Sequence, residues 1–329
     1  MLKVYLALLF CAAFVNAAPY FNATTYVYKT VGDLQIELDV YVPPKFVPPQ
    51  SGYPVFFVIH GGAYVFGQKR AAFTDQEFNE TMDRGWVLVS IDYRLVPGVV
   101  FKDIIDDIQD AYDWVRSSLI KIVPINPDLI TVFGQSAGGG LAVICGYKIT
   151  PRPAAIISFY PGYTNWTGLH IKSPTNKLIV ADAKRLRTPV FSMYSPKSLA
   201  DPVIVLLIAA YEDGQLPWLM TTMDPYVPGD QIMALLKEFS ATENVDAQIP
   251  PTYLAHGLKD KTVPFEQSIQ LANQLEKYHV PNVLDLIPGA DHVFDYNVTY
   301  WKEHVLPAFK FAQKYMGTPA SRPVELNYE

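Results

Sequence analysis

Short apolar runs alternate with segments of helical character along most of this chain, and the alternation constrains the fold more than any other feature. The runs at 55–59, 86–91, 129–133 and 154–159 are almost wholly apolar and have the length of a strand. Continuous apolar runs of this kind suit strands that are covered on both faces. Repeated strand–helix alternation therefore predicts an α/β fold, with a mostly parallel central sheet and helices on both faces.

The remaining segments extend this pattern and interrupt it once. Further elements are expected as helices at 70–84, 103–120, 137–147, 264–278 and 300–315 and as strands at 252–255 and 283–287. Segments 24–31 and 34–42 flank a Gly-Asp turn signal, which predicts an antiparallel N-terminal hairpin at the sheet edge. Residues from about 163 to 248 carry seven prolines among short helical pieces and are expected to form an inserted cap.

The N-terminus has the layout of a secretory signal peptide over residues 1–17. Lys3 supplies a short positive region, residues 4–15 are apolar, and Val15 and Ala17 occupy the −3 and −1 positions of a cleavage site. The apolar run is too short to span a membrane, although an uncleaved anchor or a first buried strand remains the alternative. A single domain over 18–329, with the cap as an insertion in it, and a secreted, extracellular location are expected.

Four Asn-X-Ser/Thr sequons agree with export. They lie at Asn22, Asn79, Asn165 and Asn297. Each sequon alone is weak evidence because the pattern arises by chance. Four of them behind a signal peptide predict a secreted glycoprotein.

Composition limits the possible partners. Half of the 329 residues are hydrophobic and 18% are charged, which is typical of a globular chain with a large core. The net charge is −6 and no Lys/Arg-rich run occurs, so nucleic acid is not expected as a partner. No later stretch approaches ~20 uninterrupted apolar residues, so no stable membrane insertion is expected. Without Cys11, Cys145 has no partner for an internal disulfide. The oligomeric state stays open.

The segment Gly134-Gln135-Ser136-Ala137-Gly138 fits the G-x-S-x-G pattern. A buried strand is expected to end just before it, and a helix of small residues is expected just after it. This strand–turn–helix context predicts a nucleophile elbow with Ser136 as the nucleophile, and the flanking glycines Gly134 and Gly138 let the strained turn close. The alternative is a tight turn with an incidental serine.

The segment His60-Gly61-Gly62-Ala63 directly follows the expected strand at 55–59. Glycines let a backbone approach a substrate closely, and backbone N–H groups can stabilise the oxyanion of a tetrahedral intermediate. We therefore expect an oxyanion hole formed by the N–H groups of Gly62, Ala63 and Ala137, with Gly61 as a loop glycine. A plain glycine-rich turn is the alternative.

A serine hydroxyl needs an adjacent base, and the base needs a carboxylate that orients it. His292 follows the strand expected at 283–287, and Asp260 lies in a loop after an earlier strand. The resulting order Ser136, Asp260, His292 is that of an α/β-hydrolase triad. Asp291 competes with Asp260, but its adjacency to His292 gives poor geometry; a helix N-cap is the alternative role for Asp260.

The other candidate residues have weaker assignments. His256 lies at a strand end, where a structural role is expected. No His, Cys or carboxylate cluster has metal-ligand spacing, so neither a metal nor an organic cofactor is expected. Aromatic and apolar cap residues are candidates for an acyl or aryl pocket or for packing of the cap: Trp166, Phe191, Tyr194, Tyr211, Trp218 and Met220.

Together, these motifs resemble those of the hormone-sensitive-lipase-like carboxylesterases of the α/β-hydrolase superfamily (fold-3 type). The matching pieces are 60–63, 90–97, 134–139 and the loops of Asp260 and His292. The chain departs from the family pattern at Ala63, where a third glycine is usual, and at Gln135, where an acidic residue is common. The Asp260 loop is more similar to those of peptidase-like and dienelactone-hydrolase-like relatives. The Asp-Tyr-Arg stretch at 92–94 is expected to be structural.

The resemblance implies a serine hydrolase that cleaves a small-molecule carboxylic ester through an acyl-enzyme intermediate. An amide-cleaving relative, either a formamidase or a peptidase of short peptides, is the alternative among enzymes. A non-catalytic hydrolase-like binding protein is the alternative from another class.

Overall fold

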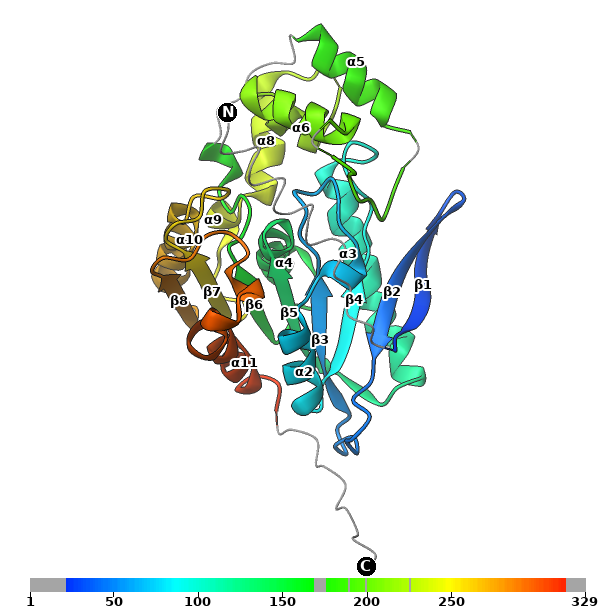
Figure 1. Cartoon of the computed structure of the whole chain (residues 1–329), viewed down its shortest axis with the longest axis vertical. Helices are drawn as coiled ribbons and strands as arrows, with labels where there is room; N and C mark the ends of the chain where they lie inside the picture. Colours follow the sequence, from blue (N-terminus) through cyan, green and yellow to red (C-terminus); the bar gives the residue numbers. More distant parts are fainter. Residues whose placement is uncertain (1–21, 169–175, 189, 199, 225, 318–329) are drawn as a thin grey trace, which may run out of the picture.

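The computed structural model describes residues 22–317 except 169–175, 189, 199 and 225. Within them, eight strands form one sheet in the order β1-β2-β4-β3-β5-β6-β7-β8 (Figure 1). The strands are β1 Thr24–Val31, β2 Leu34–Tyr41, β3 Tyr53–Ile59, β4 Val87–Ile91, β5 Ile125–Gln135, β6 Ala155–Phe159, β7 Thr252–Gly257 and β8 Asn282–Ile287. Strands β3 to β8 pair in parallel, whereas β1 and β2 pair antiparallel at one edge. The predicted α/β architecture with an antiparallel N-terminal edge is confirmed.

Helices cover the sheet on both faces, and β3 shows why its sequence is continuously apolar. The helices outside the cap are α2 Asp75–Asp83, α3 Phe101–Ser117, α4 Ala137–Lys148, α10 Glu266–Lys277 and α11 Leu306–Gln313. Val55 and Phe57 share one core cluster with residues of α3 and α4. Phe56 and Val58 share a second cluster with residues of α2 and α11. Successive side chains of a strand point to opposite faces, so both sets are buried.

The helix expected at 70–84 is two separate pieces. A 3₁₀ turn at Lys69–Ala71 (η1) is followed by α2, which begins after Thr74. The Thr74 side chain accepts a hydrogen bond from the Glu77 N–H, and the Glu77 carboxylate accepts one from the Thr74 N–H. This reciprocal capping box sets the start of α2, so the helical character expected at 70–84 is divided between a 3₁₀ turn and an α-helix.

The predicted cap falls in the interval between β6 and β7. This interval contains η3 Trp166–Gly168, α5 Lys177–Leu186, α6 Pro202–Glu212, α7 Leu216–Thr221, α8 Gly229–Phe239 and α9 Ala241–Asn244. Figure 1 shows α5, α6 and α8 grouped above one end of the sheet. Helix α6 begins where the Asp201 side chain accepts from the Val203 N–H, with Pro202 at the first helical position.

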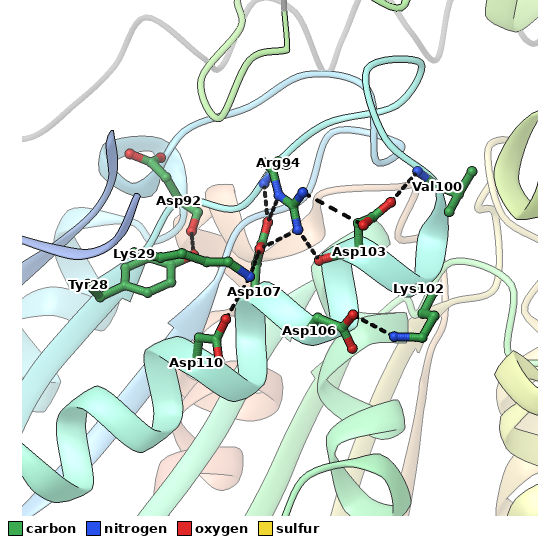
Figure 2. Close-up of polar contacts among 10 residues, drawn as sticks. All are labelled: Tyr28, Lys29, Asp92, Arg94, Val100, Lys102, Asp103, Asp106, Asp107 and Asp110. Atoms are coloured by element: carbon green, nitrogen blue, oxygen red, sulfur yellow. Dashed lines mark hydrogen bonds and ion pairs between the residues drawn. The ribbon is translucent and has the colours of Figure 1, made fainter. Parts of the chain in front are cut away.

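Ion pairs fasten the edge hairpin to α3. Lys29 on β1 lies 2.7 Å from Asp107 and 2.6 Å from Asp110 of α3. Arg94 donates from Nε and Nη2 to the two oxygens of Asp107, each at 2.8 Å (Figure 2). Asp107 is fully buried, so this carboxylate is matched by two cations inside the protein. The arrangement gives the 92–94 stretch the structural role expected for it.

Only some of the predictions about export concern residues that the structure describes. The predicted signal peptide 1–17 lies outside the described residues. Asn22, Asn79 and Asn297 are exposed, whereas Asn165 is half-buried and its amide oxygen accepts from the Gly168 N–H. Across the described part of the chain, no helix combines the length and apolarity that crossing a membrane requires.

Candidate active site

Ser136 occupies a strained turn between β5 and α4. Its backbone has φ 55° and ψ −122°, a conformation that costs free energy for any residue other than glycine. A Cβ atom on Gly134 would lie 2.1 Å from the Gly138 carbonyl oxygen, and one on Gly138 would lie 2.1 Å from the Ile59 carbonyl oxygen. Glycine is therefore required at both positions, and the turn can then hold Ser136 at the end of β5.

The three residues expected to form a triad are brought together. His292 Nε2 lies 3.0 Å from Ser136 Oγ, and His292 Nδ1 lies 2.7 Å from Asp260 Oδ2. His292 follows β8 and Asp260 follows β7, so both come from loops at the edge of the sheet where Ser136 lies. These distances are within hydrogen-bond range for a nucleophile, a base and an orienting acid.

Asp260 is held more firmly than the sequence suggested. Its Oδ1 accepts from the N–H groups of Thr262 and Val263 at 2.8 and 2.9 Å, and its Oδ2 lies 3.2 Å from His256 Nε2. Burial raises the pKa of Asp260, but the hydrogen bonds with His256 and His292 outweigh this effect and hold the pKa below its usual range. Asp260 is therefore ionised near neutral pH. His256, expected to be structural, thus contacts the carboxylate that faces His292.

Asp291, the competitor for the acid role, contacts the backbone instead of the imidazole. Its Oδ1 accepts from the N–H of His292 at 2.9 Å and from the N–H of Lys261 at 3.1 Å. It therefore joins the loop of His292 to the loop of Asp260. The adjacency argument that favoured Asp260 over Asp291 agrees with this geometry.

The loop after β3 presents free backbone donors beside Ser136. Gly62, Ala63 and Tyr64 have φ values of 109°, 51° and 66°. Within the described residues, the N–H groups of Gly62, Ala63 and Ala137 donate no hydrogen bond. Gly62 lines one pocket next to Ser136, while Ala63 and Ala137 line another. The three expected donors are thus unused and adjacent to the serine, as an oxyanion hole requires.

Buried side chains pack against the loop after β3 and form hydrogen bonds with it. The ring of Tyr93 stacks on His60 with centroids 4.2 Å apart, and the Tyr93 hydroxyl donates to the His60 carbonyl oxygen. Burial lowers the pKa of His60 to about 4, so its imidazole is neutral at physiological pH. Lys69 donates to Asp92 at 2.7 Å from both its backbone N–H and its Nζ. The Asp-Tyr pair at 92–93 therefore supports the loop that carries the free donors.

Two small pockets meet at Ser136. The pocket beneath the cap has a volume of about 90 Å³ and is lined by side chains of α6 and α7, among them Leu207, Tyr211 and Met220. The other has a volume of about 50 Å³ and is lined by residues that include His60 and Tyr160. Among the described residues that line either pocket, none is Asp, Glu, Lys or Arg. Ser136 therefore faces two spaces without charged described residues in their lining.

The cap aromatics named from the sequence divide between pocket lining and packing. Tyr211 and Met220 line the pocket beneath the cap. Trp166 and Trp218 are each only 1% exposed and pack in the core cluster that joins the cap to the sheet. Phe191 and Tyr194, which stack on each other with centroids 5.5 Å apart, are not among the pocket residues named for either space. No group of three or more His, Cys, Asp or Glu side chains within the described ranges could hold a metal ion.

Comparisons with known proteins place this geometry in a family context. Residues 38–156 match the model of the BD-FAE family, and residues 198–319 match that of the prolyl oligopeptidase family. Esterase 2 of Thermogutta terrifontis, phosphonylated by sarin, superposes with a TM-score of 0.61 at 22% identity over 92% of this chain and 97% of that one. The chain is an α/β-hydrolase.

A second solved structure agrees with the fold of this α/β-hydrolase. The acetyl ester-xyloside bifunctional hydrolase of Caldicellulosiruptor lactoaceticus superposes with a TM-score of 0.60 at 19% identity, covering 91% of this chain and 97% of that one. At such identities the likeness concerns the fold alone. The two matched families are hydrolases, which agrees with the expected carboxylic ester hydrolase, and the superfamily expected from the motifs is confirmed.

Curated sequence relatives of the hydrolase include much larger proteins. The non-reducing polyketide synthase ascC of Acremonium egyptiacum is 28% identical over 326 residues, which cover 88% of this chain and 15% of the synthase. The synthase Preu3 of Preussia isomera is 28% identical over 83% of this chain and 13% of its own length. The hydrolase thus spans a small fraction of the length of these relatives.

Proposed function

We propose that this α/β-hydrolase is a serine esterase that cleaves small, neutral carboxylic esters. The observation that carries the proposal is the continuous contact chain from Ser136 Oγ through His292 to Asp260, with spacings of 3.0 and 2.7 Å. Unused backbone N–H donors beside the serine support the same assignment.

In the first half of the reaction, His292 Nε2 takes the proton of Ser136 as its oxygen attacks the ester carbonyl carbon. Asp260 accepts from His292 Nδ1 and stabilises the imidazolium that forms. The N–H groups of Gly62, Ala63 and Ala137 donate to the carbonyl oxygen as it becomes negative. Each such donor is worth roughly 3–4 kcal/mol in the barrier.

In the second half, the imidazolium returns the proton to the leaving alcohol, and an acyl-enzyme remains on Ser136. Water then attacks the acyl carbon while His292 takes one of its protons. The tetrahedral intermediate collapses, the acid leaves and Ser136 regains its proton. The same donors stabilise both oxyanions, so no further group is needed for turnover.

The substrate class follows from the pockets. Spaces of about 50 and 90 Å³ suit small substituents on the two sides of an ester, and neither is lined by a charged described residue. Solved structures with this fold include an esterase with bound propionate or butyrate and an acetyl ester-xyloside bifunctional hydrolase. We therefore propose esters with acyl groups of the size of acetate to butyrate.

A series of nitrophenyl esters of increasing acyl length tests this proposal, with Ser136→Ala as the control. We expect the highest kcat/KM for the short acyl groups and a steep fall for long ones. The Ser136→Ala variant should keep its fold and lose about 10⁶-fold in kcat, the scale seen when a triad serine is removed. Unchanged turnover in that variant, or no fluorophosphonate adduct on Ser136 of the folded wild type, would sink the proposal and favour a binding protein.

Amide cleavage is the second candidate, because residues 198–319 match the prolyl oligopeptidase family. Aryl formamides and short prolyl peptides belong in the same assay series. The pockets weigh against peptides with a free amino terminus, since no carboxylate among the described lining residues is available to bind the ammonium group. A kcat/KM for an amide above that for every ester would reverse the assignment.

We further propose that the mature enzyme is a secreted glycoprotein. The layout of residues 1–17 supports export, and the exposed asparagines Asn22, Asn79 and Asn297 are accessible to a glycosyltransferase. Mass spectrometry of the protein from its native host should find cleavage after Ala17 and glycans on these asparagines. Unmodified asparagines and an intact N-terminus would contradict the proposal.

A further inference from the structure

A group of buried polar side chains next to the serine turn has no part in the mechanism above. Glu77 on α2 and Asp295 in the 3₁₀ turn η4 (Phe294–Tyr296) are both fully buried. Gln135 precedes the nucleophile, and its Nε2 donates to Asp295 Oδ2 and lies 3.3 Å from Glu77 Oε2. One amide group therefore connects two carboxyl groups inside the protein.

The carboxyl pair, Glu77 and Asp295, has no Lys or Arg partner among the residues that the structure describes. Within the part of the chain that the structure describes, no Lys or Arg forms an ion pair with either residue. Two buried carboxylates repel each other, so the pair keeps at least one proton near neutral pH. Burial raises the pKa of Asp295 to about 7, and burial together with the charge of Asp295 raises that of Glu77 well above its usual range.

The pair is also connected to the catalytic histidine. The hydroxyl of Tyr160, just after β6, donates to Asp295 Oδ1. The Tyr160 ring packs against the imidazole of His292, with centroids 4.5 Å apart and planes tilted by 60°. Asp295 also follows His292 by three residues in the same loop. Asp295 therefore contacts Gln135, the residue before Ser136, and Tyr160, whose ring packs on His292.

The surroundings indicate which member of the pair carries the proton. Glu77 Oε2 accepts from the Thr74 N–H at 2.7 Å, whereas the described donor nearest to Glu77 Oε1 is the Gln135 amide at 3.4 Å. Both oxygens of Asp295 instead accept hydrogen bonds, Oδ2 from the Gln135 amide and Oδ1 from the Tyr160 hydroxyl. A proton on Glu77 Oε1 thus disturbs no close hydrogen bond, whereas ionised Asp295 keeps both of its donors.

We propose that Asp295 is a positioning residue for His292. Fixed by Gln135 and Tyr160, its carboxylate holds the histidine loop against the serine turn and places a second buried negative charge near the imidazole. Glu77 holds its proton to higher pH than Asp295 does, so above neutral pH Asp295 is charged when His292 accepts the proton of Ser136. The ionisable groups around Asp295 are Glu77 from α2, Tyr160 after β6, and His292 and Tyr296 from its own loop.

Asp295→Asn tests the role of the charge, because an amide has the shape of a carboxylate but is uncharged. The inference rests on the proposed esterase reaction. The new amide oxygen can accept from Gln135, and its N–H₂ can donate to the Tyr160 oxygen. Loss of a nearby negative charge lowers the pKa of an imidazole. We expect the acidic limb of the kcat/KM–pH profile to move down by about one pH unit, and kcat to fall about tenfold with KM within about twofold.

Glu77→Gln should shift the acidic limb of the kcat/KM–pH profile in the opposite direction. It leaves Asp295 as the only carboxyl of the pair and keeps the negative charge close to His292. The acidic limb is then expected to move to higher pH. A movement of the acidic limb to lower pH, as expected for Asp295→Asn, would contradict the sharing of a proton between the two carboxyl groups.

Asp107→Asn is the matched control, because it removes the charge of an equally buried aspartate whose partners are Arg94 and Lys29. It should lower stability and leave the pH profile in place. An unshifted limb in folded Asp295→Asn would overturn the inference. If that variant does not fold, Tyr160→Phe can be used instead, because it keeps the ring and removes only the hydrogen bond. We expect a smaller shift of the acidic limb in the same direction. The absence of any shift would overturn the inference.

A measurement without substrate separates this inference from the esterase proposal. The NMR resonance of the His292 Nδ1 proton, which faces Asp260 at 2.7 Å, can be titrated in the wild type and in each variant. The titration midpoint should be lower in Asp295→Asn by about one pH unit. A wild type that hydrolyses no ester defeats the proposed function, whereas equal midpoints in the two proteins defeat the positioning role.

Discussion

Asp107 and Asp295 are both fully buried aspartates, but their surroundings differ in the charge they supply. Asp107 receives two hydrogen bonds from the Arg94 guanidinium and an ion pair from Lys29 (Figure 2). Asp295 receives hydrogen bonds only from neutral groups among its described partners, and a second carboxyl is joined to it through Gln135. The first site fastens an edge hairpin to a helix, whereas the second lies beside the proposed catalytic residues.

The difference teaches how to separate a structural buried charge from a functional one. A carboxylate matched by cations is stable as an ion, and removing one partner leaves the others unpaired. A buried carboxylate without a cation raises the free energy of the folded state at neutral pH. Such a group persists only where its charge has a use, and the neighbouring imidazole of His292 provides one. The two sites should therefore respond to neutralisation with opposite signs.

The largest effect is expected for Asp107→Asn. Arg94 and Lys29 would lose the carboxylate that compensates them, because an amide is uncharged. We expect the free energy of unfolding to fall by about 3 kcal/mol, measured by urea denaturation at pH 7. A loss below about 0.5 kcal/mol would mean that solvent or Asp110 compensates the two cations as well as Asp107 does.

Asp295→Asn should stabilise the protein at alkaline pH. The folded-state pKa of Asp295 is raised from 3.8 to about 7, so the folded state binds this proton more tightly than the unfolded state does. Its contribution to stability is therefore complete below about pH 4 and is lost as the pH rises towards and through about 7. Removing the group should increase the free energy of unfolding by about 1–3 kcal/mol at pH 8.

The pH dependence checks this stabilisation. Urea denaturation of both proteins from pH 5 to pH 8 should give curves that diverge as the pH rises. A variant that is less stable than the wild type at pH 8 would show that Asp295 is held by favourable charge interactions, as Asp107 is. The contrast between the two sites would then be lost.

The smallest effect is expected for Lys29→Met. Methionine keeps most of the apolar stem, and Arg94 still compensates Asp107. The Lys29 side chain is 19% exposed, so part of its ion-pair energy is screened by solvent. We expect a loss of about 1 kcal/mol in the same denaturation assay. A loss as large as that of Asp107→Asn would mean that Arg94 alone does not balance the aspartate.

The sequence was sufficient to predict the sheet and the meeting of Ser136, Asp260 and His292 at one edge of it. In a parallel sheet the loops after successive strands meet at one edge, so Ser136, Asp260 and His292 could be expected to converge once the strands before them were recognised. The apolar runs made those strands visible because they are covered on both faces. The glycines at 134 and 138 marked the turn, and the structure gives their close contacts.

The carboxyl pair could not be predicted in the same way. Glu77 is 58 residues from Gln135, and Asp295 is 160 residues from it, so no local pattern joins them. Asp295 reads as an ordinary polar loop residue, and Glu77 reads as a charge on the exposed face of a helix. One signal was available, namely Gln135 at a position where related esterases commonly have an acid. The sequence also could not show which cap aromatics line the pocket and which pack in the core, because both roles require the same apolar side chains.

Every residue to which a step of hydrolysis is assigned lies outside the stretch from η3 to α9. Ser136, Asp260, His292, Gly62 and Ala63 belong to loops of the sheet and Ala137 begins α4, while α6 and α7 contribute only walls of one pocket. Grafting a different helical segment between β6 and β7 would therefore change which molecules are admitted without altering the bond-breaking apparatus. Such separability gives evolution, or an engineer, an independent means of retuning selectivity.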